Sequence, residues 1–289
     1  MNLTEIKNRI SSIEQTRKIT KAMHLISTVK MRKALSKLEK NSTYLDRLRM
    51  SIKDILTHSE DLDHPFICEC TGNRTAFVVV AGDKGLAGPF NYNVLNMAIN
   101  HMKDVEEKYL FTIGHMATSF FNRKNYMVDI EFLHTAQNPE LYHARQIAES
   151  LIDLFVQGHI DKIEIIYTHL ISTLSQEPRA ITILPMDLDY FEDVQDYSDF
   201  SGTFQYDPSP NTVFDTIVPQ YIIGVIYSVL VQSYASEQCC RMTAMDNATQ
   251  NADDIIKRLK LKFSRARQAA VTNEMLEVAN ATNAVLDLK

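Results

Sequence analysis

The chain has 289 residues, of which 45% are hydrophobic and 23% are charged, and its formal net charge is −6. This composition predicts a globular chain with one large domain or two modest ones, and it excludes an intrinsically disordered protein. No run approaches the roughly 18 consecutive apolar residues of a membrane-spanning helix. The first residues lack an apolar core and an Arg/Ser-rich stretch, so we expect neither a secretory signal nor an organelle presequence.

The four cysteines form two close pairs, Cys68 with Cys70 and Cys239 with Cys240. In a chain of this length, and without a histidine at ligand spacing, they predict neither a disulfide framework nor a zinc site. We therefore expect a reducing, cytoplasmic setting.

Glycine and proline are confined to the middle of the sequence. All eight glycines and all eight prolines lie between Pro65 and Gly224. Glycine costs about 1 kcal/mol and proline about 3 kcal/mol in a helix interior. Their absence near both ends predicts a helix at each end of the chain. We divide the chain into an N-terminal coiled-coil helix (1–64), a central α/β domain (65–210) and a C-terminal coiled-coil helix (211–289).

The hydrophobic period of both ends supports a coiled coil. Near the C-terminus, apolar or small residues follow steps of three and four over about four heptads: Met242, Met245, Thr249, Ala252, Ile256, Leu259, Phe263, Ala266 and Ala270. The N-terminal segment has a stripe in two parts: Ile6, Ile10 and Ile13, then Leu35, Leu38, Ser42, Leu45, Leu48, Ile52 and Ile55. We predict a long antiparallel two-helix coiled coil. The alternative is two separate helices folded over the central domain.

The middle of the chain alternates between predicted strands and helices. Strands are expected at 75–81, 109–113, 126–133, 163–168 and 180–185, and helices at 91–106 and 139–157. This alternation predicts a Rossmann-like α/β domain with a mostly parallel sheet and helices on its faces. Residues 187–210 are acidic, aromatic and loop-like.

A glycine-rich turn, GDKGLAGP at 82–89, follows the first predicted strand. Its spacing matches neither the P-loop nor the G-x-G-x-x-G fingerprint, so a tight strand-to-helix turn is favoured over a nucleotide site. None of the nine histidines lies in an H-E-x-x-H motif, and no G-x-S-x-G is present. The sequence predicts no catalytic site and no cofactor.

Charge is distributed unevenly along the chain. Residues 1–53 hold thirteen Lys or Arg against four Asp or Glu, and residues 241–289 hold eight against six. The remaining residues hold nine against twenty-six. Basic ends predict an acidic partner, although solvated lysines on long helices account for part of the bias. Nucleic acid is not favoured, because a nucleic-acid-binding domain is usually basic overall.

Several segments resemble the gamma subunit of F-type ATP synthases. The specific motifs are RISSIEQTRKITKAM at 9–23, KMRKA at 30–34, SEQCCRMTAMDNATQNA at 236–252 and RARQAAVTNE at 265–274. The glycine turn at 82–91 fits more loosely, because Pro89 stands where the family has a second glycine. Asn280 and Ala281 replace a glycine that the family usually has near the C-terminus.

The resemblance implies a non-catalytic rotor without a cofactor, on the cytoplasmic face of a bacterial cell membrane. Its coiled coil would enter an α3β3 hexamer, and its globular part would meet the epsilon subunit and the membrane c-ring. Rotation would couple ion flow to ATP synthesis or hydrolysis. By motif position, Lys18, Lys21 and Met23 would lie near an acidic lever of the β subunit. Arg267 and Gln268 would engage the β catch loop.

Two other functions stay open from the residues alone. One is a coiled-coil adaptor or tether that is unrelated to ATP synthesis. The other is an α/β enzyme with helical extensions, which the missing catalytic motifs disfavour.

Overall fold

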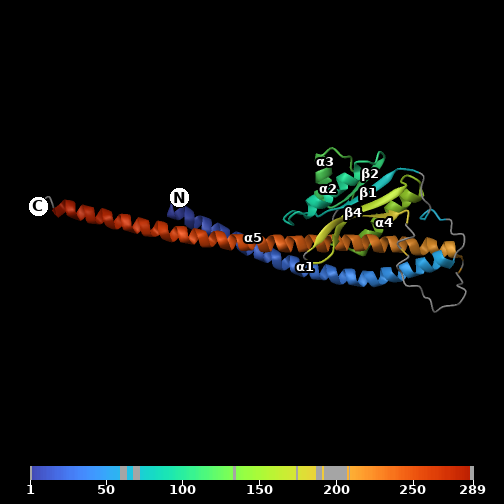
Figure 1. The fold of residues 1–289 in the computed structure, drawn as a ribbon, viewed down its shortest axis with the longest axis horizontal. Helices are drawn as coiled ribbons and strands as arrows, with labels where there is room; N and C mark the ends of the chain where they lie inside the picture. Colours follow the sequence, from blue (N-terminus) through green and yellow to red (C-terminus); the bar gives the residue numbers. More distant parts are fainter. Residues whose placement is uncertain are drawn as a thin grey trace. The chain divides into compact units, whose positions relative to one another are not determined.

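The computed structural model describes residues 2–58, 64–67, 72–132, 135–173, 175–186, 191, 207 and 209–286 (Figure 1). The helices are α1 (Leu3–His58), α2 (Phe90–Met102), α3 (His115–Arg123), α4 (Leu141–Val156) and α5 (Pro210–Leu286). The strands are β1 (Thr75–Val80), β2 (Lys108–Ile113), β3 (Ile130–Phe132), β4 (Lys162–Leu170) and β5 (Gln176–Leu184). The chain divides into two compact units, Met1–Ile26 with Met242–Lys289, and Ser27–Arg241. We call them the coiled-coil unit and the sheet unit. The three-part division at residues 64 and 210 stays a proposal.

The two terminal helices are as long as the distribution of glycine and proline predicts. Helix α1 has 56 residues and α5 has 77. Helix α5 begins at Pro210 and takes in Pro219 and Gly224. A proline suits the first turn, where its missing N–H has no helical partner, but Pro219 leaves the carbonyl of Asp215 without its helical donor.

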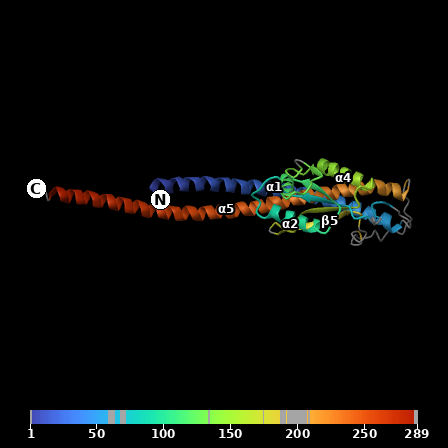
Figure 2. The ribbon, with the colours of Figure 1, turned by 90° about the horizontal axis from the view of Figure 1, so that it is seen from above.

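Side-chain pairs show that the coiled-coil unit is antiparallel. Glu14 pairs with Lys260, Arg17 with Asp253 and Thr20 with Thr249, so the α5 partner moves back along the sequence as α1 advances. Heptad positions of α5 are buried in this unit: Met245, Ala252, Ile256 and Leu259. Both views show α1 beside α5 here, with the C-terminal end of α5 running past the N-terminus (Figures 1 and 2). The predicted coiled coil is confirmed, and the alternative of two separate helices is wrong.

The sheet has the strand order β3-β2-β1-β4-β5. Strand β1 pairs in parallel with β2 and β4, β2 pairs in parallel with β3, and β5 alone runs antiparallel, against β4. The predicted Rossmann-like, mostly parallel sheet is confirmed. Strand β3 begins later than predicted, because among the described residues of 126–133 only 130–132 pair with β2. Before them Asp129 accepts a hydrogen bond from the backbone of Leu110 through its side chain (2.7 Å).

Helix α3 was not predicted. It has nine residues, and its buried side chains are Ala117, Thr118 and Phe121. A helix with so few apolar positions gives a weak periodic signal in the sequence. Its start is set by Gly114, whose φ of +94° favours glycine.

Alternate residues of β1 face two apolar layers within the sheet unit. Phe77 and Val79 pack with α2 and α3, whereas Val78 and Val80 pack in the cluster that contains α4, the buried part of α5 and the end of α1. Figure 1 shows α2 and α3 on the side of the sheet away from α5. The result is a three-layer arrangement with a sheet buried on both faces.

Helix α5 supplies much of this core. One window of 18 residues in it has the length and apolar composition of a membrane span, but 44% of the window is buried within the fold. Ile222, Ile226 and Leu230 each have at most 2% of their surface exposed. A core helix covered by a sheet and other helices has the same composition as a membrane span.

Within the sheet unit, α1 and α5 approach closely at Gly224. The Asn41 side chain donates a hydrogen bond to the Gly224 carbonyl (2.9 Å), and a Cβ at Gly224 would lie 2.7 Å from Cδ2 of Leu45. The buried face of α1 runs here through Met31, Ala34 and Asn41, whereas Ser42 is exposed. The predicted α1 stripe is therefore wrong at Ser42, because a polar side chain that bonds the facing backbone takes the buried position.

Candidate functional site

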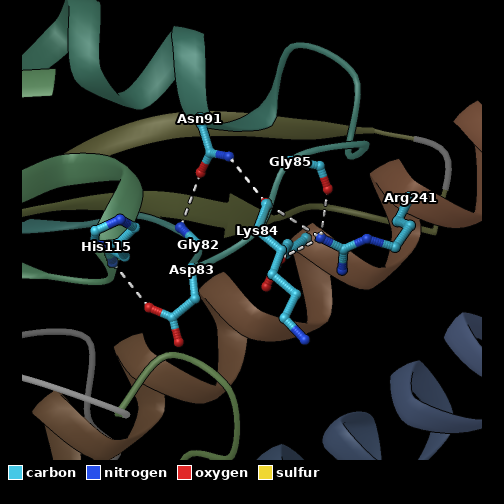
Figure 3. Close-up of polar contacts among 8 residues, drawn as sticks. Gly82, Asp83, Lys84, Gly85, Asn91, His115 and Arg241 are labelled. Carbon is cyan, nitrogen blue, oxygen red and sulfur yellow. Dashed lines mark hydrogen bonds and ion pairs between the residues drawn. The ribbon is translucent and has the colours of Figure 1, made fainter. Parts of the chain in front are cut away.

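The glycine turn after β1 is tied to two helices by hydrogen bonds (Figure 3). The amide of Gly82 donates to Oδ1 of Asn91 in α2 (2.8 Å). Asp83 Oδ1 accepts from the amide of His115, the first residue of α3 (2.9 Å). The turn therefore fixes the ends of β1, α2 and α3 against one another.

Helix α5 binds the same turn through Arg241. Its Nη2 donates to the carbonyls of Gly85 (3.1 Å) and Lys84 (3.4 Å) and to Oε1 of Glu237, one helical turn earlier (2.5 Å). The side chains of Arg241 and Glu237 are only 11% and 8% exposed. Burial raises the pKa of Glu237, and the charge of Arg241 opposes that shift. We call these four residues, Lys84, Gly85, Glu237 and Arg241, the α5 latch.

The latch lies beside the crevice where doubly wound folds bind ligands. In such sheets the strand order reverses at one point, here between β1 and β4, and the crevice opens at the carboxyl ends of the two strands. Ser236 of α5 donates to the carbonyl of Thr168 in β4 (3.2 Å), and Glu237 lies so close to Gly82 that a Cβ there would be 2.9 Å from its Oε1. The cavity left between Ala81, Ser233 and Glu237 measures about 10 Å³, the space of one water at most. Helix α5 fills this crevice with its own side chains.

The five residues predicted to meet the β subunit lie in the coiled-coil unit, in two groups on different helices. Lys18 and Lys21 are exposed and Met23 is half-buried on α1, and Arg267 and Gln268 are exposed on α5. The α1 group is interspersed with apolar side chains that face solvent: Ile19 is 60% exposed, Leu25 58% and Ile26 55%. Nothing in the structure tests their partner, so their roles stay predictions.

The structure adds residues that the sequence reading missed. In the sequence, Glu237 and Arg241 appear only as part of a family motif, and Gly82 only as part of a turn. The available signal was a Glu and an Arg four residues apart in an otherwise apolar part of the last helix, which is unusual for a surface ion pair.

Among the described residues, no group of three or more His, Cys, Asp and Glu side chains could hold a metal ion. Cys239 is buried and Cys240 is half-buried, and burial raises the pKa of the Cys239 thiol to about 11. A thiol with that pKa is a poor nucleophile at neutral pH. Cys68 and Cys70 lie outside the described residues.

Comparison with known proteins gives one family. The family model "ATP synthase" matches residues 2–285. The chain is 41% identical to the ATP synthase gamma chain of Ruminiclostridium cellulolyticum, over 98% of this chain and 99% of the relative. It is 40% identical to the gamma chain of Caldanaerobacter subterraneus, over 96% of this chain and 98% of the relative.

Solved structures agree in fold. A chain of the Euglena gracilis mitochondrial ATP synthase aligns with a TM-score of 0.66 at 13% identity, over 98% of this chain and 94% of that one. A chain of the central stalk and c-ring assembly of Tetrahymena thermophila aligns with a TM-score of 0.58 at 22% identity, over 80% of this chain and 99% of that one. The match to the family model and the identity to two full-length bacterial relatives lead to one conclusion: this chain belongs to the ATP synthase gamma-chain family.

Proposed function

We propose that this chain is the central-stalk rotor of an ATP synthase, and that its coiled-coil unit turns inside a hexamer of α and β subunits. The observation that carries the proposal is the antiparallel coiled coil of α1 and α5 with apolar side chains exposed on it. Ile19, Leu25, Leu261 and Met275 are each more than half exposed. Apolar side chains at this density on a helix surface are typical of an interface with a protein partner.

Rotation would act through differences between the faces of the rotor. Subunits that are identical in sequence adopt different conformations when each meets a different face of a central shaft. A shaft needs length, and α5 with its 77 residues would run about 115 Å at 1.5 Å per residue. The energy of rotation would then alter the nucleotide site of each β subunit in turn.

The predicted contacts follow from charge and position. Lys18 and Lys21 would face an acidic lever of the β subunit, with Met23 packed between the two surfaces. Arg267 and Gln268 would bind the β catch loop, the arginine through charge-assisted hydrogen bonds and the glutamine through its amide. Both pairs are exposed in the chain alone, as residues that bind a partner must be.

Within the sheet unit, α1 carries a separate basic patch that favours the same kind of partner. Lys30, Lys33 and Lys37 line a hollow of about 310 Å³ together with Asn138 and Tyr234. Among the residues that the structure describes, no acidic side chain lines this hollow. An acidic segment of a partner subunit would complement it.

We propose that the chain itself is not catalytic. The crevice that would hold a nucleotide in a doubly wound fold is filled by Ser236 and Glu237. Catalysis would belong to the β subunits of the complex. The sheet unit would meet the epsilon subunit and the c-ring, so that the chain reaches the cytoplasmic face of the membrane only through the c-ring.

Assembly tests the proposal. Co-expression with the α and β subunits of the same organism should give an α3β3γ complex that hydrolyses ATP and is recovered in one peak by size-exclusion chromatography. An adaptor or tether unrelated to ATP synthesis would not enter the complex. Recovery of α and β without this chain, or ATP binding by the isolated chain, would contradict the rotor.

A further inference from the structure

We propose that Glu237 and Arg241 are positioning residues for torque: they lock one turn of α5 to the glycine turn after β1, so that α5 cannot twist or slide against the sheet. This inference rests on the proposed rotor function and assigns one point inside the sheet unit at which torque passes between α5 and the sheet. It follows from the directions of the latch hydrogen bonds, their burial and the close approach at Gly82.

Most of the contact between α5 and the sheet unit is apolar. Side chains such as Phe214, Ile222 and Leu230 are buried against the sheet and α4. Hydrophobic contact is strong but has no preferred direction, so it resists separation better than it resists slow rotation of a helix about its axis. A shaft that transmits torque needs directional contacts as well.

The latch supplies directional contacts at the end of the sheet unit. Arg241 donates to two backbone carbonyls of the turn, at Lys84 and Gly85, and to Glu237 on its own helix. Because the acceptors on the turn are backbone atoms, they move only if the turn moves. Arg241 is also the last residue of the sheet unit. The latch is therefore the final polar attachment of α5 within that unit.

The turn that receives Arg241 is itself anchored on its far side. The Asn91 side chain accepts a hydrogen bond from the amide of Gly82, and the Asp83 side chain accepts one from the amide of His115. Force on Arg241 is thus passed to β1, α2 and α3 together (Figure 3). A surface ion pair has no such backing and is screened by solvent.

A substitution at Gly82 tests the contact between Glu237 and the glycine turn independently, by adding bulk to the turn. A Cβ at this position would lie 2.9 Å from Oε1 and 3.0 Å from Cδ of Glu237, whereas a Cβ at Gly85 would meet no atom within 4 Å. Gly82→Ala therefore displaces Glu237 without removing any charge or hydrogen-bonding group.

The test uses the full chain in an α3β3γ complex, with a bead attached to the sheet unit at the exposed position Glu107→Cys, in a Cys68→Ser, Cys70→Ser background. The angular variance of the bead during a catalytic pause reports the torsional stiffness. Arg241→Gln, Glu237→Gln and Gly82→Ala should each raise this variance at least twofold and lower the yield of ATP synthesised per turn. Arg179→Gln, which removes an exposed Arg–Glu pair of the same unit, should match the parent complex.

The double variant Glu237→Gln, Arg241→Met distinguishes a role in torque from a role in stability alone. It leaves no unpaired buried charge, so its melting temperature should recover relative to the single variants. Its angular variance should stay high, because the bonds to the turn are still missing. Two results would overturn the latch: an angular variance that recovers together with the melting temperature, or an angular variance at the parent value in all three single variants. Rotation of the parent complex would still support the rotor function in either case. A parent complex that assembles but does not rotate would contradict the rotor function itself.

Discussion

Within the sheet unit, the Leu45 side chain of α1 packs directly against Gly224 of α5, where a larger residue would meet it. A Cβ added at Gly224 would lie 2.7 Å from Cδ2 of Leu45, and the Asn41 side chain donates a hydrogen bond to the Gly224 carbonyl. Gly224→Val should lower the free energy of unfolding by about 1–3 kcal/mol, as expected for an overpacked core. Chemical denaturation of the purified chain measures the loss, and Ser42→Ala on the exposed side of α1 is the control. If the denaturation midpoint of Gly224→Val equalled that of the parent, the contact at Gly224 would not contribute to stability.

Asp161 gives a second prediction at the scale of single residues. Arg74 binds both carboxylate oxygens of Asp161 (2.8 and 2.9 Å), and these hydrogen bonds hold the pKa of Asp161 below its usual range although burial opposes the shift. A group with a lowered pKa stabilises the fold above its unfolded pKa, about 3.9 for Asp, and loses that contribution as the pH falls through the folded value.

The pair should therefore contribute fully at neutral pH and fade only in acid. Arg74→Met should reduce the melting temperature at pH 7, and the difference from the parent should shrink as the pH falls through the lowered pKa of Asp161. Thermal melts between pH 2 and 7 measure the difference. A gap between the two chains that widens in acid would contradict the assignment.

For single residues, the sequence predicts a role where the signal is a local pattern such as heptad spacing. It does not predict a role that depends on a contact between segments far apart in the chain. The buried positions Met245, Ala252, Ile256 and Leu259 follow from heptad spacing alone. The latch does not follow from spacing, because the sequence gives Glu237 and Arg241 no partner until the glycine turn, more than 150 residues away, is placed against them. Asn41 was assigned no role for the same reason.

At the scale of elements, the coiled coil is the part whose loss has the clearest consequence. Leu259 is a buried heptad position of α5 in the coiled-coil unit. Leu259→Pro removes a helical hydrogen bond and clashes with the preceding turn, at a cost of about 3 kcal/mol or more. The sheet unit should still fold, but the chain should fail to enter an α3β3 complex. Leu259→Ala, which keeps the helix, is the matched control, and a Leu259→Pro chain that supports normal ATP hydrolysis would place the shaft elsewhere.

Element prediction succeeded where strands and helices are long or strongly patterned. The run TAFVVV predicts β1, and the run AITIL predicts the second half of the antiparallel edge strand β5. Helix α3 and the start of β3 were not predicted, because both elements are short and are fixed by tertiary contacts, such as that of Asp129 with Leu110. The predicted loop at 187–210 lies mostly outside the described residues.

At the scale of the whole molecule, the contacts proposed with the β subunit yield a prediction about coupling. Replacing Arg267 and Gln268 together by alanine should leave the fold intact, because both side chains are exposed. Loss of the proposed charge-assisted hydrogen bonds should weaken rotor retention at least tenfold, as expected when about 1.4 kcal/mol or more of binding is lost, and should lower ATP synthesis. Lys262→Ala, at another exposed position of α5, is the control. Wild-type ATP synthesis in the double variant would refute this contact.

The central claim is that this chain turns as a rotor within an α3β3 complex. The most direct measurement is to attach a bead to the sheet unit of this chain in an immobilised α3β3γ complex and to follow its angle after ATP is added. The account predicts rotation in one direction, with one pause for each β subunit, that stops when ATP is removed. A complex that hydrolyses ATP at its full rate while the bead shows only random angular motion would contradict it.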